Sequence, residues 1–149
     1  LMSLVACNIK QKIGEKIGEK IVESALGNKV DIDGNEVKIK GDDGQIVTYG
    51  SDKWPESDLI KKIPKFEKGT IEGSYSDNKG AIISLKDVKK DDFLNYLEKV
   101  KDKFPVNASE YNAEDLITYS GSNDKNITVH ISLLIKEMTM GIQIMDKSE

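Results

Sequence analysis

The sequence predicts an α+β fold: an N-terminal amphipathic helix, then an antiparallel β-meander, then β-β-α-β-β-β with one helix packed on an antiparallel sheet. Two observations favour this class. Apolar residues alternate with polar ones in several short segments separated by Gly- and Asp-containing turns, which is typical of half-buried strands. Two other segments repeat apolar residues every three or four positions, as amphipathic helices do. At 149 residues the chain is expected to form one domain, residues 8–149.

The first predicted helix covers residues 8–27, where Ile9, Ile13, Ile17 and Ile21 recur every four residues and Gly27-Asn28 provides a stop. An isolated helix of this length is marginal, so it needs a packing partner. One interpretation is an ordinary helix that covers the sheet. The other is a membrane-proximal or self-associating helix, which would make a homodimer through this helix possible.

Residues 29–50 are predicted to form a three-stranded meander. Val30 and Ile32 alternate before the turn Asp33-Gly34-Asn35, and the pattern then continues to Tyr49. Asp-Gly steps between alternating apolar segments indicate hairpins. The same acidic residues also match the start of a calcium loop, but Glu36 stands where that loop needs glycine, so turn chemistry is favoured.

The remainder is expected to add a short helix after Pro55 that ends at Pro64, and then six elements. A hairpin joins residues 70–76 and 81–85, and a helix of about residues 90–103 presents Phe93, Leu97, Val100 and Phe104 on one face. Strands are expected at the ranges 116–120, 127–135 and 139–145. The one-sided alternation of the strand at 127–135 predicts an antiparallel sheet with one face in water.

The first seven residues, Leu1-Met-Ser-Leu-Val-Ala-Cys7, match the end of a lipoprotein signal peptide, and Leu4-Val5-Ala6-Cys7 matches its lipobox. Cys7 is therefore the expected lipid-attachment residue, and residues 1–7 are interpreted as a signal-peptide remnant. Two acyl chains on one cysteine anchor a protein stably. The predicted location is the extracellular face of the cell membrane. The alternative is a structural cysteine, since single cysteines often lie in cores.

Two further motifs resemble those of uncharacterised lipoproteins of Gram-positive (clostridial or bacillus-like) bacteria. One motif is Trp54-Pro55…Leu59…Ile63-Pro64-Lys65-Phe66…Gly69-Thr70-Ile71, and the other is the helix Asp92-Phe93-Leu94-Asn95-Tyr96-Leu97-Glu98-Lys99-Val100-Lys101. In that family a glycine before an aromatic residue often follows the helix, whereas Lys103-Phe104 stands here. The resemblance implies an extracytoplasmic domain of unknown function, with no catalytic residues to transfer.

The composition excludes some partners. The net charge is −4 with acids and lysines interspersed, so no basic stripe is available for nucleic acid. All 22 basic residues are lysines, and there are 18 isoleucines and 9 asparagines. Their AT-rich codons suggest a low-GC bacterium. Without arginine the chain lacks the bidentate fork that binds phosphate or carboxylate.

No catalytic constellation is evident in the sequence, so no catalytic residue, metal site or cofactor is predicted. His130 is the only histidine and lies at a polar position of its strand, where a surface role is favoured. With a single His and a single Cys, a zinc site lacks ligands. Trp54 beside Pro55 is expected to pack over a core edge, although stacking on a sugar ring is the alternative.

The leading functional hypothesis is a membrane-anchored, non-enzymatic lipoprotein that binds a protein, a peptide or an envelope component. The second is a cell-envelope enzyme that acts on glycan through surface carboxylates, which clustering of Trp54, His130 and two carboxylates in one cleft would favour. The third is a structural or assembly role through the N-terminal helix, which exposed Ile13, Ile17 and Ile21 would favour.

Overall fold

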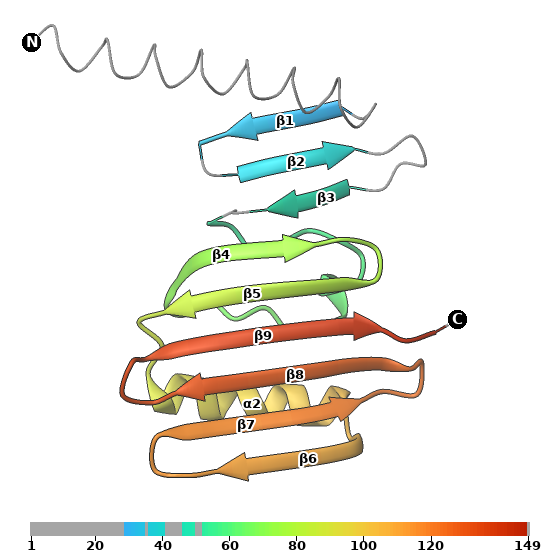
Figure 1. Cartoon of the computed structure of the whole chain (residues 1–149). Coiled ribbons are helices and arrows are strands. Elements are labelled where there is room, and N and C mark those ends of the chain that lie inside the picture. The colour runs from blue at the N-terminus through green and yellow to red at the C-terminus, as the bar shows by residue number, and fades with distance from the viewer. Residues whose placement is uncertain (1–28, 35, 41–45, 50–51, 149) are drawn as a thin grey trace, which may run out of the picture.

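The computed structural model describes residues 29–34, 36–40, 46–49 and 52–148. These residues are mostly β, with nine antiparallel strands and one α-helix (Figure 1). The elements are β1 (Lys29–Asp33), β2 (Glu36–Lys40), β3 (Ile46–Tyr49), the 3-10 helix η1 (Ile60–Lys62), β4 (Thr70–Ser76), β5 (Gly80–Lys86), α2 (Lys90–Lys103), β6 (Val106–Asn112), β7 (Leu116–Ser122), β8 (Ile127–Leu134) and β9 (Thr139–Asp146).

The strands form one sheet in the order β1-β2-β3-β4-β5-β9-β8-β7-β6. Among the described residues, the meander β1–β3 pairs with the rest of the sheet at two positions, Thr48–Ser76 and Tyr49–Tyr75. The α-helix crosses one side of the sheet behind β7 and β8 in Figure 1. We call the side that α2 covers the helix side and the other the open side. The predicted helix on an antiparallel sheet is thus confirmed.

Helix α2 forms where the sequence combines favourable end charges with an apolar stripe. Asp91 and Asp92 lie in its first turn, and Lys101 and Lys103 lie in its last turn, which suits the helix dipole. Its buried residues, spaced three or four apart, are Phe93, Tyr96, Leu97 and Val100. They pack in one core with inward-facing residues of β5, β7, β8 and β9. The ring of Phe66 meets that of Tyr96 edge-on, with centroids 5.2 Å apart.

Strands β7, β8 and β9 alternate almost perfectly between the two sides. Their helix-side residues are buried: Ile117, Tyr119, Gly121, Ile127, Val129, Ile131, Leu133, Met140, Ile142 and Ile144. The residues between them are half-buried or exposed, and His130 is exposed, as the sequence predicted. The register pairs positions of one side across strands, so the alternation of each strand reinforces that of its neighbours.

The meander reverses this arrangement. Lys38 is aligned through β3 and β4 with Ala81, a core residue, so Lys38 lies on the helix side. By the same register, the apolar residues Val30, Ile32, Val37 and Ile39 lie on the open side. Val30 is 5% exposed. The apolar side of the sheet therefore changes between β1–β2 and β5–β9.

Two predictions about elements were wrong. Strand β6 was not expected, because Val106–Asn112 is exposed at every residue and shows no alternation. It is an edge strand, and its pairing with β7 is interrupted between Val106 and Ser109. The short helix expected between Pro55 and Pro64 is only the 3-10 turn η1. The N-terminal helix of residues 8–27 and the signal remnant of residues 1–7 lie outside the described residues.

Candidate functional site

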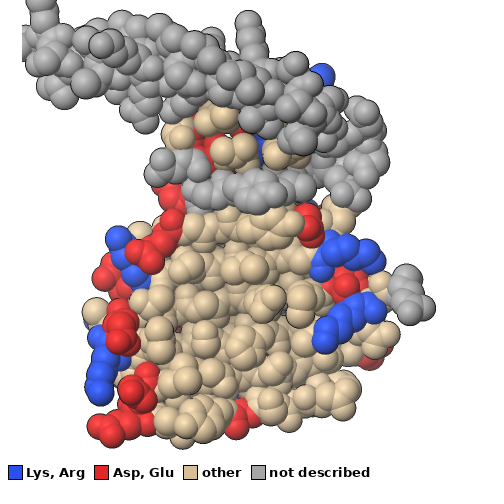
Figure 2. Space-filling view, in the orientation of Figure 1, with Lys and Arg blue, Asp and Glu red and all other residues tan. Residues whose placement is uncertain are grey.

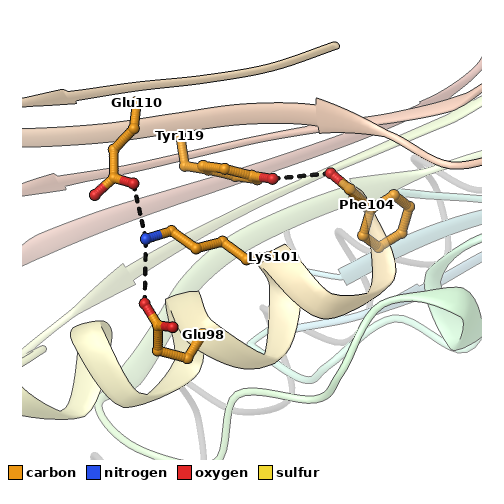
Figure 3. Close-up of polar contacts among 5 residues, drawn as sticks. All are labelled: Glu98, Lys101, Phe104, Glu110 and Tyr119. Carbon is orange, nitrogen blue, oxygen red and sulfur yellow. Dashed lines mark hydrogen bonds and ion pairs between the residues drawn. The ribbon is translucent and has the colours of Figure 1, made fainter. Parts of the chain in front are cut away.

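A polar clamp holds β6 and β7 against the end of α2 (Figure 3). The Lys101 ammonium lies 2.7 Å from Glu110 of β6 and 3.1 Å from Glu98 of the helix. The Tyr119 hydroxyl of β7 donates a 2.8 Å hydrogen bond to the carbonyl oxygen of Phe104, just after the helix. Hydrogen bonding to Glu110 raises the pKa of Lys101, and burial raises the pKa of Tyr119. Both groups therefore stay protonated near neutral pH and keep the clamp closed.

The open side of the central strands presents a surface without charged residues, which we call the open face. Lys86, at the end of β5, lies on the open side outside this surface and pairs with Glu72 at 3.7 Å. The open face consists of the other open-side residues of four strands, without Gly80 at the start of β5: Ile82, Ser84, Leu116, Thr118, Ser120, Ser122, Thr128, His130, Ser132, Leu134, Thr139, Gly141, Gln143 and Met145. None of these positions holds Lys, Asp or Glu, in a chain that is 32% charged. Figure 2 shows this uncharged area, with acids and lysines gathered at both ends of the strands.

The helix side of β1 and β2 is a second strand surface outside the core, and its composition is the opposite. By register, its positions are Lys29, Asp31, Asp33, Glu36, Lys38 and Lys40, and every one is charged. Lys38 and Glu36 pair at 2.6 Å, and this hydrogen bond raises the pKa of Lys38. The same chain thus uses charged residues on one strand surface and uncharged residues on the other, so overall composition does not explain the open face.

Apolar side chains stand out from the uncharged area. Ile82 is 50% exposed and Leu134 is 44% exposed. At the β6 edge Tyr111 is 58% exposed and Val106 is 43% exposed, and both pair with open-side residues of β7. Some hydroxyl groups between them already have partners within the face. Ser122 and Thr128 share a 2.9 Å hydrogen bond, and Ser120 donates to the carbonyl of Val129 at 3.4 Å.

Trp54 lies on the helix side, half-buried against the core. It lines a groove of about 520 Å³ together with Asp52, Lys53, Lys65, Phe66, Glu67, Lys68, Gly69, Thr70, Ile71 and Leu85. His130 lies on the open face, so the sheet separates the two residues. The cleft containing Trp54, His130 and two carboxylates, which would favour a glycan enzyme, is therefore not formed. Trp54 packs over a core edge, as predicted.

The remaining candidate residue, Cys7, lies outside the described residues. Among the described residues, no group of three or more His, Cys, Asp or Glu side chains is placed to hold a metal ion. No helix in the described part of the chain has the length and apolar character needed to cross a membrane.

The chain matches no protein-family model, no curated protein and no solved structure.

Sequence reasoning identified His130 as a surface residue but did not identify the open face around it. A signal was present in the alternating polar positions of residues 116–122, 127–134 and 139–145. These positions hold Ser, Thr, His and Gln, where a water-facing strand of this Lys- and Glu-rich chain would be expected to hold charges. The type of polar residue, and not only its spacing, carried the information.

Proposed function

We propose that this chain is the extracytoplasmic domain of a lipid-anchored bacterial lipoprotein, and that it acts as a binding module through its open face. The observation that carries this proposal is the contrast between the two strand surfaces. Every helix-side position of β1–β2 is charged, whereas the open side of β5, β9, β8 and β7 has a single charged residue, Lys86 at the end of β5. Removing a charged side chain from water is expensive, so the buried centres of protein interfaces are depleted of Lys, Asp and Glu.

The geometry of the open face also suits docking. The face lies on a continuous antiparallel sheet whose other side is packed against α2, and the Lys101–Glu110 and Tyr119–Phe104 contacts hold its far strands in place. A partner therefore meets a surface that needs little ordering when it binds, which favours affinity. Exposed Ile82, Leu134 and Tyr111 supply apolar and aromatic anchors. Tyrosine is one of the residue types that most often dominate the energy of protein interfaces, and burial of the isoleucine and leucine side chains adds a favourable hydrophobic contribution.

The predicted lipid attachment indicates where the protein acts. The Leu4-Val5-Ala6-Cys7 segment and the resemblance to lipoproteins of Gram-positive bacteria support attachment through Cys7 to the extracellular face of the membrane. In this setting the partner is a protein or peptide of the cell envelope. The module itself needs no cofactor for binding.

Site-specific photocrosslinking tests the binding face. A photoreactive phenylalanine derivative is placed at Ser132, at the centre of the open face, in the full chain expressed in a Gram-positive host. The matched control carries the same residue at Asn95, an exposed position of α2. We expect a discrete adduct from position 132 and none from position 95. Equal adduct patterns from the two positions would refute a role for the open face.

Metabolic labelling tests the address. Cells that express the chain receive a clickable fatty acid, and the membrane fraction is compared between the wild type and Cys7→Ala. We expect label on the wild type only, and release of the variant from the membrane, because the acyl chains supply the attachment. Equal label on both proteins would show that Cys7 is not the acceptor.

One observation favours the alternative hypothesis of an enzyme that acts on cell-envelope glycan. The ring of Trp54 lines a groove together with the acidic residues Asp52 and Glu67. Trp54 is the only tryptophan in the chain, so its fluorescence reports on this groove alone. Titration with soluble peptidoglycan fragments would shift the emission if sugars stack there. An unchanged spectrum, with Trp54→Phe as the blank, would remove this alternative.

A further inference from the structure

We propose that the partner of the open face is a second copy of this chain, so that two sheets pack face to face about a twofold axis. This inference rests on the binding role proposed for the open face and adds the identity of the partner. Homo-oligomers with twofold symmetry are the commonest assemblies, and their interfaces bring one surface patch against itself. A patch that pairs with the same patch of a second copy must not bring like charges together.

The distribution of charge favours self-pairing through this face. The open side from β4 to β6 carries one ion pair, Lys86 with Glu72 at 3.7 Å near one end of β5, and the open face itself has no Lys, Asp or Glu, so two copies bring few like charges together. The other exposed surfaces of the described part are rich in charge. For example, the exposed residues of α2 include Lys90, Asp91, Glu98, Lys99, Asp102 and Lys103. Bringing such a surface against its own copy would require each charge to find an opposite one.

The area is sufficient for a specific contact. The sheet from β4 to β6 contains six strands, and each is seven or eight residues long. At about 4.8 Å between strands and about 3.3 Å per residue, their open side measures about 29 by 23 Å, or roughly 650 Å² per copy. A pair would bury about 1,300 Å², within the range of specific interfaces.

The relief of the face suggests how two copies fit. Ile82 is aligned with Gln143 of β9, and Leu134 is aligned with Thr139 of the same strand. Gly141 lies midway between these two positions and is flanked by Ser84 and Ser132 on the neighbouring strands. Two protruding apolar side chains therefore stand on either side of a low centre without a side chain.

The positions of the apolar side chains are symmetric about Gly141. A twofold axis through Gly141, in the plane of the face and at right angles to the line from Ile82 to Leu134, places Ile82 of one copy opposite Leu134 of the other. The two glycines then face each other at the axis, between two apolar contacts of Ile82 with Leu134. The hydrogen bonds of Ser122 with Thr128 and of Ser120 with Val129 leave fewer hydroxyl groups to be satisfied when water is removed.

Sedimentation of the full chain in a Cys7→Ser background, which removes lipid and thiol, tests the assembly. We expect the parent chain to dimerise and Ser132→Lys to weaken the dimer by more than about tenfold, because the twofold brings the two new charges together. Asn95→Lys adds the same charge on α2 and should leave the dimer unchanged. Urea melts check that both variants are folded. A parent chain that stays monomeric, or equal effects of the two lysines, would overturn the proposal.

Disulfide formation between single-cysteine chains tests the geometry in the same background. A mixture of Ile82→Cys and Leu134→Cys chains should cross-link rapidly, whereas Ile82→Cys mixed with Asn95→Cys should not. A dimer in which the first mixture forms no more disulfide than the second would overturn the stated axis.

The photocrosslinked adduct at position 132 separates the two levels of inference. An adduct of twice the mass of the chain supports self-pairing. An adduct with a different protein, together with a monomeric chain in sedimentation, overturns self-pairing while the open face remains a binding surface. A monomer that gives no adduct overturns both proposals.

Discussion

Strand pairs β1–β2 and β7–β8 belong to one sheet and show the same alternation, but their apolar residues point to opposite sides. In β7–β8 the apolar side carries Ile117, Val129 and Ile131, and α2 covers it. In β1–β2 the corresponding side carries charges such as Asp31 and Lys38, and the apolar residues lie on the open side. A sheet that extends beyond its helix thus changes the side on which its apolar residues lie.

The polar sides of β1–β2 and β7–β8 face opposite directions, and they also contain different types of polar residue. The polar side of β1–β2 uses Lys, Asp and Glu, which is the usual choice for a surface that stays in water. The polar side of β7–β8 uses Ser, Thr and His and holds the exposed Leu134. We infer that solvation alone shapes the first surface, whereas the second also has to be compatible with contact to another molecule.

The helix-covered side of the sheet should show the largest effect of a single substitution. Leu97 is 1% exposed between α2 and the sheet, so Leu97→Ala should lower the free energy of unfolding by about 2–5 kcal/mol through lost burial and a cavity. Leu134→Ala, on the open face, should change the free energy by less than about 0.5 kcal/mol in the monomer. Urea melts of both variants provide the measurement. The reverse order would show that the two sides are assigned wrongly.

The next largest effect is expected from substitution of glycine by alanine, which should change stability differently on the two sides of the sheet. A Cβ added at Gly121, on the helix side, would lie 2.1 Å from the Phe104 carbonyl oxygen and 2.8 Å from the Tyr119 hydroxyl. Gly121→Ala should therefore disrupt the clamp and destabilise the fold by about 3 kcal/mol. At Gly141, on the open face, the nearest atom is the Ser132 hydroxyl oxygen at 3.2 Å, which can rotate away. Thermal melts should show little change for Gly141→Ala, and equal losses would contradict the packing described.

Much of this fold could be predicted from the sequence because local patterns specify it. The hairpin across Asp77 and Gly80 and helix α2 were expected at nearly their observed bounds, and the buried residues Phe93 and Leu97 were identified from helical spacing. Strand β6 was missed because it is an edge strand, exposed on both sides, with no period to detect. The change of side between β2 and β5 was not predictable, because alternation reveals that one side is apolar but not which one.

The candidate site was harder to predict for a related reason. His130 was placed correctly on the wet side, yet its neighbours on β7 and β9 come from separate segments of the sequence. Only the register brings Ser120 and Gln143 to either side of His130. The absence of charge at the open-face positions becomes visible once these strands are aligned, because each strand alone contributes too few positions to stand out.

The apolar side of β1–β2 should show an intermediate effect. Val30 is 5% exposed although it lies on the side away from α2. Val30→Ala removes two methyl groups and should lower the free energy of unfolding by roughly 1–2 kcal/mol at about 0.8 kcal/mol per buried group. Lys38→Ala, on the charged side of the same strands, removes a surface ion pair and should change stability by less than about 1 kcal/mol. If Val30→Ala proved neutral in chemical denaturation, the meander would contribute no apolar packing on its open side.

The smallest effect on folding is expected at His130, and it separates the role of the open face in stability from its role in binding. His130 is exposed, and its ring is not part of the core, so His130→Ala should change the free energy of unfolding by less than about 0.5 kcal/mol. His130→Asp should be tolerated equally well by the monomer, because water still solvates the new carboxylate. In the dimer the same carboxylate would be buried in an uncharged interface, so association should weaken while the urea midpoint of the monomer stays constant. A loss of monomer stability in His130→Asp would instead mean that the open face is uncharged for reasons of folding.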